Sequence, residues 1–239
     1  MTWRWLISFS ALTFISFTAV ARGAMVSGKV VLRDSRVAAV SKLGNYSGVV
    51  ISLLPLDGPA DPEPRRARML QKDKTFAPHV LAISTGSTVD FPNADPIFHS
   101  AFSSYNGQIF DVGLYPPGTN RAVRFTRPGV VRVFCNIHPT MSAVIVVLKT
   151  PYFDTTGKDG SFHLSAPAGD YELDVFHERA TEATLRGLKR QITLGGSAVQ
   201  LPEIDISESG WLAVPHKNKF GHDYPPGSGD DSLYPGAPQ

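Results

Sequence analysis

The sequence of 239 residues contains a single cysteine, so it cannot form an internal disulfide framework. It also lacks an excess of one charge, because 23 basic residues stand against 21 acidic ones. This near-balance argues against a nucleic-acid-binding surface. Beyond the N-terminus there is neither an apolar run of membrane-spanning length nor a long segment with helical spacing. These absences favour a globular protein built from short strands.

Short runs rich in Val, Ile, Phe and Thr occur throughout the chain. They are separated by turns that draw on 21 glycines and 19 prolines. Several short strands with such turns predict an all-β protein made of sandwiches or barrels.

Residues 1–21 are predicted to be a secretory signal peptide. Arg4 gives a basic start, Trp5–Val20 is almost entirely apolar, and Ala19-Val20-Ala21 fits a cleavage site. The alternative is a membrane anchor, for which the apolar run is somewhat short. We therefore expect an exported, periplasmic protein with no stable membrane insertion after cleavage.

The only cysteine lies in a short loop between two apolar runs, Val130–Phe134 and Ala143–Leu148. The same loop contains His138 and Met141, so three metal-capable side chains share it. An unpaired Cys135 in an oxidising compartment is a liability unless it has a role such as metal binding. A buried, inert cysteine is the alternative, and the neighbouring His138 and Met141 argue against it.

One Cys and two His with a weak axial Met form the donor set of a blue-copper electron-transfer site. The second His must come from outside the loop, and His99 is the candidate, with His79 as its rival. Zinc would require four good ligands, usually without Met. Haem attachment would require a C-x-x-C-H motif, which is absent.

The middle of the chain resembles a cupredoxin of the plastocyanin/amicyanin type. Cys135-x-x-His138-x-x-Met141 has amicyanin-like spacing, and residues 86–93 (GSTVDFPN) resemble the strand that precedes the first His ligand. Residues 127–135 (RPGVVRVFC) resemble the approach to the thiolate. The position of the first ligand after residues 86–93 favours His99 over His79.

This resemblance implies a Greek-key β-sandwich over residues 65–149 that holds one type I copper ion. The implied ligands are His99, Cys135, His138 and Met141. The implied function is non-enzymatic: an exported protein carries single electrons between redox partner proteins through the edge of His138. An apolar patch around that edge is expected from Phe98, Tyr115 and Pro139, although each could instead be a core residue.

The chain departs from the cupredoxin pattern at three positions. Ser100 stands where the family has Asn, which ties the two ligand segments together, so looser segments are expected. Asn136 and Ile137 replace Ser or Thr followed by Pro. Because Ile137 keeps the backbone N–H that Pro lacks, a higher reduction potential is expected.

Two flanking stretches, residues 25–60 and 150–208, resemble carboxypeptidase-regulatory-like (transthyretin-like) sandwiches. They contain the motifs GKV, GVVISL and DGSF…PAGDYELDV. Two strands alone bury too little to be stable, so we predict a second small Ig/transthyretin-like sandwich with the copper domain inserted into it. Two sequential domains are the alternative. The last strands of this second sandwich are predicted at Arg186–Leu194 and Ala198–Ile206.

Residues 209–239 carry Pro, Gly and charge without periodicity and are predicted to be a disordered tail. His216 and His222 lie in this tail and are expected to be solvated, whereas His163 and His177 are expected to be ordinary strand or strand-end residues. Two other functions stay open: copper binding or delivery, and a cell-envelope β-sandwich protein with a vestigial copper site.

Overall fold

The computed structural model describes residues 23–104, 107–212 and 215–224. Within them the protein is mostly β, with two short helices. The predicted signal peptide lies outside the described residues. No helix in the described part of the chain is both long and apolar enough to cross a membrane.

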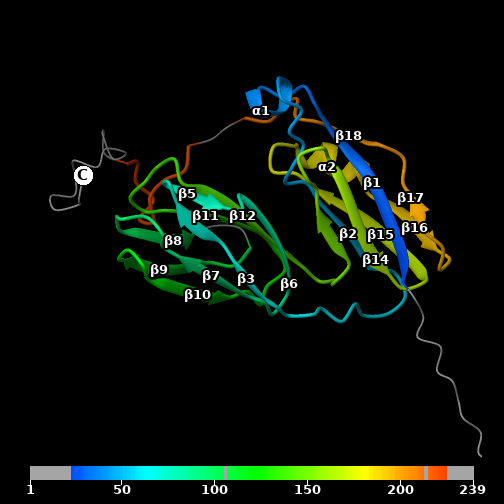
Figure 1. Ribbon diagram of the computed structural model, residues 1–239, viewed down its shortest axis with the longest axis horizontal. Coiled ribbons are helices and arrows are strands. Elements are labelled where there is room, and N and C mark those ends of the chain that lie inside the picture. Colours follow the sequence, from blue (N-terminus) through cyan, green and yellow to red (C-terminus); the bar gives the residue numbers. More distant parts are fainter. Residues whose placement is uncertain (1–22, 105–106, 213–214, 225–239) are drawn as a thin grey trace, which may run out of the picture.

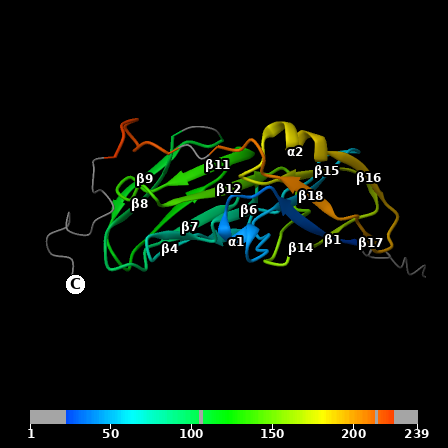
Figure 2. The same ribbon diagram turned by 90° about the horizontal axis from the view of Figure 1, so that it is seen from above.

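The strands form two units that lie side by side (Figures 1 and 2). The central sandwich lies between residues 66 and 148. Its strands are β3 (Arg66–Arg68), β4 (Leu70–Lys72), β5 (Thr75–Ala77), β6 (Val80–Ser84), β7 (Thr88–Pro92), β8 (His99–Ser103), β9 (Phe110–Tyr115), β10 (Asn120–Arg124), β11 (Gly129–Phe134) and β12 (Ser142–Leu148). They pair as a five-stranded sheet in the order β6-β12-β11-β8-β9, a three-stranded sheet β10-β7-β3 and the hairpin β4-β5.

The flanking sandwich combines strands from both sides of the central one in the sequence. Its elements are β1 (Ala24–Arg33), α1 (Ala38–Ser41), β2 (Val50–Pro55), β13 (Phe153–Thr155), β14 (Ser161–Ala166), β15 (Gly169–Phe176), α2 (Glu182–Leu188), β16 (Arg190–Leu194), β17 (Val199–Gln200) and β18 (Ile204–Ser207). One sheet has the order β14-β1-β17, with β18 also on β1, and the other has the order β13-β2-β15-β16. Antiparallel pairs β1–β14 and β2–β15 therefore join segments more than a hundred residues apart.

Strand β12 shows why a continuous apolar run is needed at the junction of the units. Successive side chains of a strand point to opposite faces. Ala143, Ile145 and Val147 belong to the core of the central sandwich, whereas Val144 and Val146 pack toward Val50 of β2 and Phe176 of β15. Both faces of β12 are thus buried, and the ligand loop that precedes it is attached to a fixed strand.

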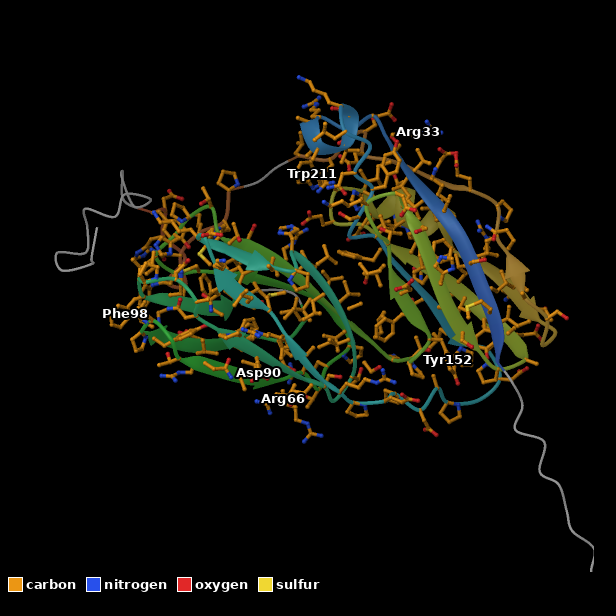
Figure 3. The ribbon with its side chains drawn as sticks, in the orientation of Figure 1. Arg33, Arg66, Asp90, Phe98, Tyr152 and Trp211 are labelled. Atoms are coloured by element: carbon orange, nitrogen blue, oxygen red, sulfur yellow. The ribbon has the colours of Figure 1, made fainter. Side chains whose placement is uncertain are left out.

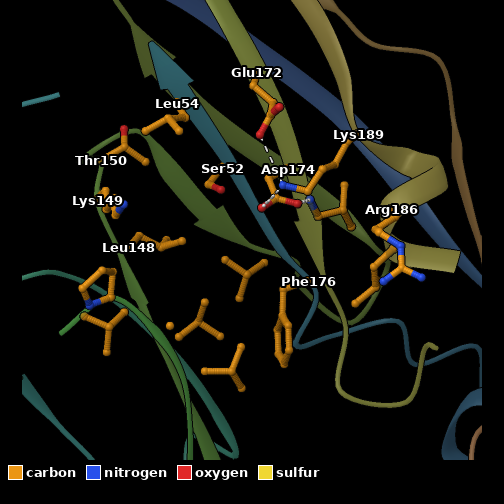
Figure 4. A pocket seen from close by; sticks show the side chains of 18 of the residues that line it. Ser52, Leu54, Leu148, Lys149, Thr150, Glu172, Asp174, Phe176, Arg186 and Lys189 are labelled. Carbon is orange, nitrogen blue, oxygen red and sulfur yellow. Dashed lines mark hydrogen bonds and ion pairs between the residues drawn. The ribbon is translucent and has the colours of Figure 1, made fainter. Parts of the chain in front are cut away.

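A cleft of about 450 Å³ opens beside this apolar junction (Figure 4). Apolar side chains from both units line it, among them Leu148 and Phe176. Lys189 lies at its edge and forms ion pairs with Glu172 and Asp174 of β15.

The prediction of a strand over Arg186–Leu194 is wrong at its start, because residues 182–188 form helix α2. Thr181 caps this helix by accepting the N–H of Thr184 at 3.2 Å. The helix has no buried residue, so the sequence carries no apolar helical period there. The predicted strand Ala198–Ile206 is also divided, because Pro202 lies between β17 and β18 and has no N–H for a ladder.

The domain boundaries and the family of the flanking sandwich stay predictions. The predicted disordered tail differs from the structure where it is described. Residues 215–224 run back to the central sandwich and make hydrogen bonds with it, as analysed below (Figure 1). Residues 225–239 lie outside the described residues.

Candidate metal centre

The loop between β11 and β12 is closed by its own backbone. The N–H of Cys135 donates to the carbonyl of Met141 at 3.1 Å, and the N–H of Met141 donates to the carbonyl of His138 at 3.0 Å. Phe134 pairs with Ser142 across the strands and with Phe102 of β8. This pairing places the loop beside the start of β8.

Three side chains converge at this place. His99 is the first residue of β8, and its Nδ1 lies 3.1 Å from Nδ1 of His138 and 3.9 Å from Sγ of Cys135. Sγ lies 3.5 Å from Nδ1 of His138. All three residues are buried, and they form the one group in the described part of the chain with metal-ligand spacing.

The surroundings of Cys135 stabilise its thiolate form. Burial disfavours the thiolate, but the contacts with His138 and His99 and the backbone N–H groups of Ile137 and Ser100 outweigh it and lower the pKa of Cys135 to about 5. The thiolate is the metal-binding form of cysteine. Two imidazoles and a thiolate suit copper and other borderline or soft metals, so this donor set fits the predicted ion.

Met141 is fully buried and belongs to the same core cluster as Cys135. His79, the rival candidate, is not in the convergent group. Its Nε2 lies 2.9 Å from both carboxylate oxygens of Glu178, at the junction with the flanking sandwich. Of the two candidates, His99 is therefore the one beside Cys135 and His138.

Ser100 does not leave the ligand segments loose, contrary to the expectation from the sequence. Its hydroxyl oxygen accepts the N–H of Asn136 at 2.7 Å and lies 3.7 Å from Sγ of Cys135. One buried hydroxyl therefore joins β8 to the ligand loop and also contacts the sulfur. A serine can replace the amide of Asn here because one oxygen both accepts and donates.

The expected apolar patch is only partly present. Tyr115 is fully buried in the core, where its hydroxyl donates to the carbonyl of Phe91 and contacts Gln71. Phe98 is 42% exposed at the end of the sandwich (Figure 3), and Pro139 is half-buried. His138 itself is only 3% exposed.

Two features of the site were missed in the sequence. Asp95 is buried and lies 2.7 Å from Nε2 of His99. Residues 215–224, which we call the C-terminal segment, cover the cysteine side of the loop. Asp95 lies in an irregular stretch before β8, where a spacing of four residues from His99 does not by itself predict a contact. Nothing in the composition of the C-terminal segment indicated a contact.

The C-terminal segment is held to the site by several contacts. The Tyr224 hydroxyl donates to the carbonyl of Cys135 at 2.7 Å, and the N–H of Lys219 donates to Oδ1 of Asn136 at 2.9 Å. His216 stacks on Phe134 with ring centroids 4.2 Å apart. The expectation that His216 is merely solvated is therefore wrong, because an aromatic ring covers it.

No protein-family model matches the chain, and no curated protein is significantly similar to it. Several solved structures resemble part of it. The copper-containing nitrite reductase NirK from Thermus scotoductus SA-01 is 28% identical over 39% of this chain, with a TM-score of 0.33, and the match spans only 25% of that enzyme. A purple cupredoxin from Nitrosopumilus maritimus is 22% identical over 34% of this chain and 99% of its own, with a TM-score of 0.32. Amicyanin from Paracoccus versutus is 17% identical over 42% of this chain and 98% of its own, also with a TM-score of 0.32.

Proposed function

We propose that the central sandwich is a cupredoxin-type domain that binds one type I copper ion and carries single electrons. The observation that carries this proposal is the buried convergence of His99, Cys135 and His138. Met141, buried in the same loop, would complete the set as a weak axial ligand. Copper bound there would supply a one-electron Cu(II)/Cu(I) couple.

The chain's own contribution is to hold the donors in place. His99 comes from the start of a paired strand, and Cys135 follows the end of another. The hydrogen bonds of Ser100 and of the loop backbone connect these segments. A donor set fixed in this way keeps its geometry when the charge of a bound ion changes, which favours electron transfer over transport of the ion.

We further propose that the protein acts outside the cytoplasm, in the periplasm, with redox proteins as partners and without catalysis of its own. The predicted signal peptide supports export. The flanking sandwich would be a transthyretin-like unit. His138 is almost fully covered, so electrons would leave through atoms in contact with its ring rather than through an exposed imidazole edge.

Redox cycling in the presence of a Cu(I) chelator tests the electron-carrier function. The copper-loaded protein should be reduced and reoxidised repeatedly with its visible spectrum restored each time. Rapid transfer of Cu(I) to the chelator on the first reduction would contradict electron transfer and favour copper delivery. A folded protein that takes up no copper would contradict both and favour a structural role in the cell envelope.

A further inference from the structure

Asp95 is a buried carboxylate that accepts hydrogen bonds from two backbone N–H groups. Oδ1 accepts the N–H of Asp73 at 2.6 Å, and Oδ2 accepts the N–H of Lys74 at 2.9 Å. Both donors belong to the β4–β5 turn, where Asp73 and Lys74 have φ values of 53° and 52°. The carboxylate therefore anchors a tight turn of the hairpin against the segment that leads into β8.

The same carboxylate contacts His99. Its Oδ2 lies 2.7 Å from Nε2 of the imidazole, whose other nitrogen faces Cys135 and His138. A neutral imidazole carries its proton on one nitrogen only, and an ionised carboxylate can only accept. The contact with Asp95 therefore places the proton on Nε2 and leaves the lone pair of Nδ1 directed toward the convergent group.

We propose that Asp95 is the positioning residue that sets the tautomer and ring orientation of His99 for metal binding. This inference rests on the proposed copper site. Outer partners of this kind fix the ring and increase the basicity of the ligand nitrogen. A more basic Nδ1 stabilises Cu(II) more than Cu(I), so Asp95 lowers the reduction potential of the site.

The substitution Asp95→Asn tests the proposal because the side chain keeps its size but cannot satisfy all its partners. If the NH2 group takes the place of Oδ2, it faces Nε2 of His99, which must then accept and carry its proton on Nδ1. If the NH2 group takes the place of Oδ1, the oxygen still accepts from Nε2, but the NH2 group meets the N–H of Asp73 and loosens the turn that holds the side chain. The first arrangement opposes metal ligation through Nδ1, and the second weakens the anchoring of the side chain that orients the ring.

We expect Asp95→Asn to weaken copper binding by about 10- to 100-fold, the usual effect of losing such a partner. The loss should be larger for Cu(II) than for Cu(I). A tenfold difference between the two corresponds to a rise of about 59 mV in the one-electron potential. Competition titrations with Cu(II) and Cu(I) chelators, together with potentiometry, measure these quantities.

The matched control is Glu178→Gln, which makes the same carboxylate-to-amide change beside His79, outside the convergent group. It should leave copper affinity and potential unchanged. Thermal unfolding of both variants shows that they are folded. Nitrogen-15 NMR of the metal-free wild type, at a pH where the ring is neutral, should show His99 as the Nε2–H tautomer, and Asp95→Asn should lose it.

Two results separate the inference from the proposed function. A copper-binding wild type, with Asp95→Asn unchanged in affinity, potential and tautomer, would overturn the role of Asp95. A wild type without a copper–thiolate band would overturn the copper site, while the tautomer of His99 in the metal-free protein would still decide whether Asp95 sets the ring.

Discussion

Hydrogen bonds to the sulfur of Cys135 would tune the potential of a copper ion held at the proposed site. The backbone N–H groups of Ile137 and Ser100 both stabilise the thiolate, and the Ser100 hydroxyl lies 3.7 Å from Sγ. Such donors stabilise the reduced site, where more negative charge stays on sulfur, and therefore raise the reduction potential.

Replacing Ile137 by Pro removes one of these donors. A hydrogen bond worth about 1 kcal/mol more in the reduced state corresponds to roughly 40 mV for one electron, so the potential should fall by an amount of this order. Redox potentiometry measures the change, with Ile137→Val, which keeps the N–H, as the control. An equal or higher potential in the proline variant would show that this N–H does not tune the sulfur.

Ser100 is expected to contribute to stability as well as to ligand geometry. In Ser100→Ala the N–H of Asn136 loses its partner in a half-buried place, which costs about 1 kcal/mol. Chemical denaturation of the metal-free protein measures this loss. Ser103→Ala, at the other end of β8 and equally buried, is the control and should be less destabilising, because the Ser103 hydroxyl has no hydrogen-bond partner among the described residues.

Single site residues could be predicted from the sequence where candidate ligands lie close together in the chain. The spacing of Cys135, His138 and Met141 places three candidate donors in one loop, whatever the rest of the fold. The roles of Ser100 and Asp95 depend on which segments meet in space. Tyr115 was considered for a surface patch, with core packing as the alternative, and the core contains it.

The C-terminal segment is the element with the clearest consequence for the site. Its Tyr224 hydroxyl binds the carbonyl of Cys135, and Lys219 binds Asn136 and also Asp111 of β9. These contacts restrain the cysteine side of the ligand loop from outside. The segment should therefore slow any opening of the loop that releases metal.

Tyr224→Phe should make copper leave faster. The variant loses one hydrogen bond of about 1 kcal/mol, which corresponds to roughly a fivefold increase in the rate of copper loss to a chelator, and truncation after residue 212 should increase it further. Tyr171→Phe removes a similar hydroxyl contact, to Pro167 in the flanking sandwich, and should have no effect. Identical rates in Tyr224→Phe, the truncated protein and the wild type would mean that the segment does not restrain the loop.

Strands were predictable where apolar runs are bounded by turns. Val130–Phe134 and Ala143–Leu148 correspond to β11 and β12 nearly residue for residue. Helix α2 was missed because it is short and has no fully buried residue, so its Thr181 cap was the clearest sign that distinguished it from a strand. The position of the C-terminal segment follows from a few polar contacts, which leave no pattern in composition.

At the scale of the whole molecule, a polar network connects the two sandwiches beside their apolar junction. His79 of the central sandwich pairs with Glu178, which also binds Arg179, and Arg179 binds Glu208 of the flanking sandwich. His177 completes the network with a contact of 2.8 Å to Glu208. The two units should therefore be coupled in a pH-dependent way.

The hydrogen bond with Glu178 raises the pKa of His79, whereas burial and Arg179 oppose the rise. A raised pKa means that the contribution to stability is complete below the unfolded value of 6.5 and is lost as pH rises through the higher folded value. Because His79 is half exposed, this contribution should be below about 1 kcal/mol.

The free energy of unfolding should therefore decrease slightly between neutral and alkaline pH, and His79→Gln should flatten this slope. Denaturant titrations across that pH range measure the effect. His163→Gln, whose side chain is exposed on β14, is the control and should keep the wild-type slope. A slope that persists in His79→Gln would assign the pH dependence to another group.

The proposed copper site is tested by the visible absorption spectrum of the protein after addition of Cu(II), recorded beside Cys135→Ser. An intense thiolate-to-copper charge-transfer band is expected that reaches a maximum at one equivalent and is lost in the variant. No such band from the folded protein, or the same band in Cys135→Ser, would contradict a copper site built on this cysteine.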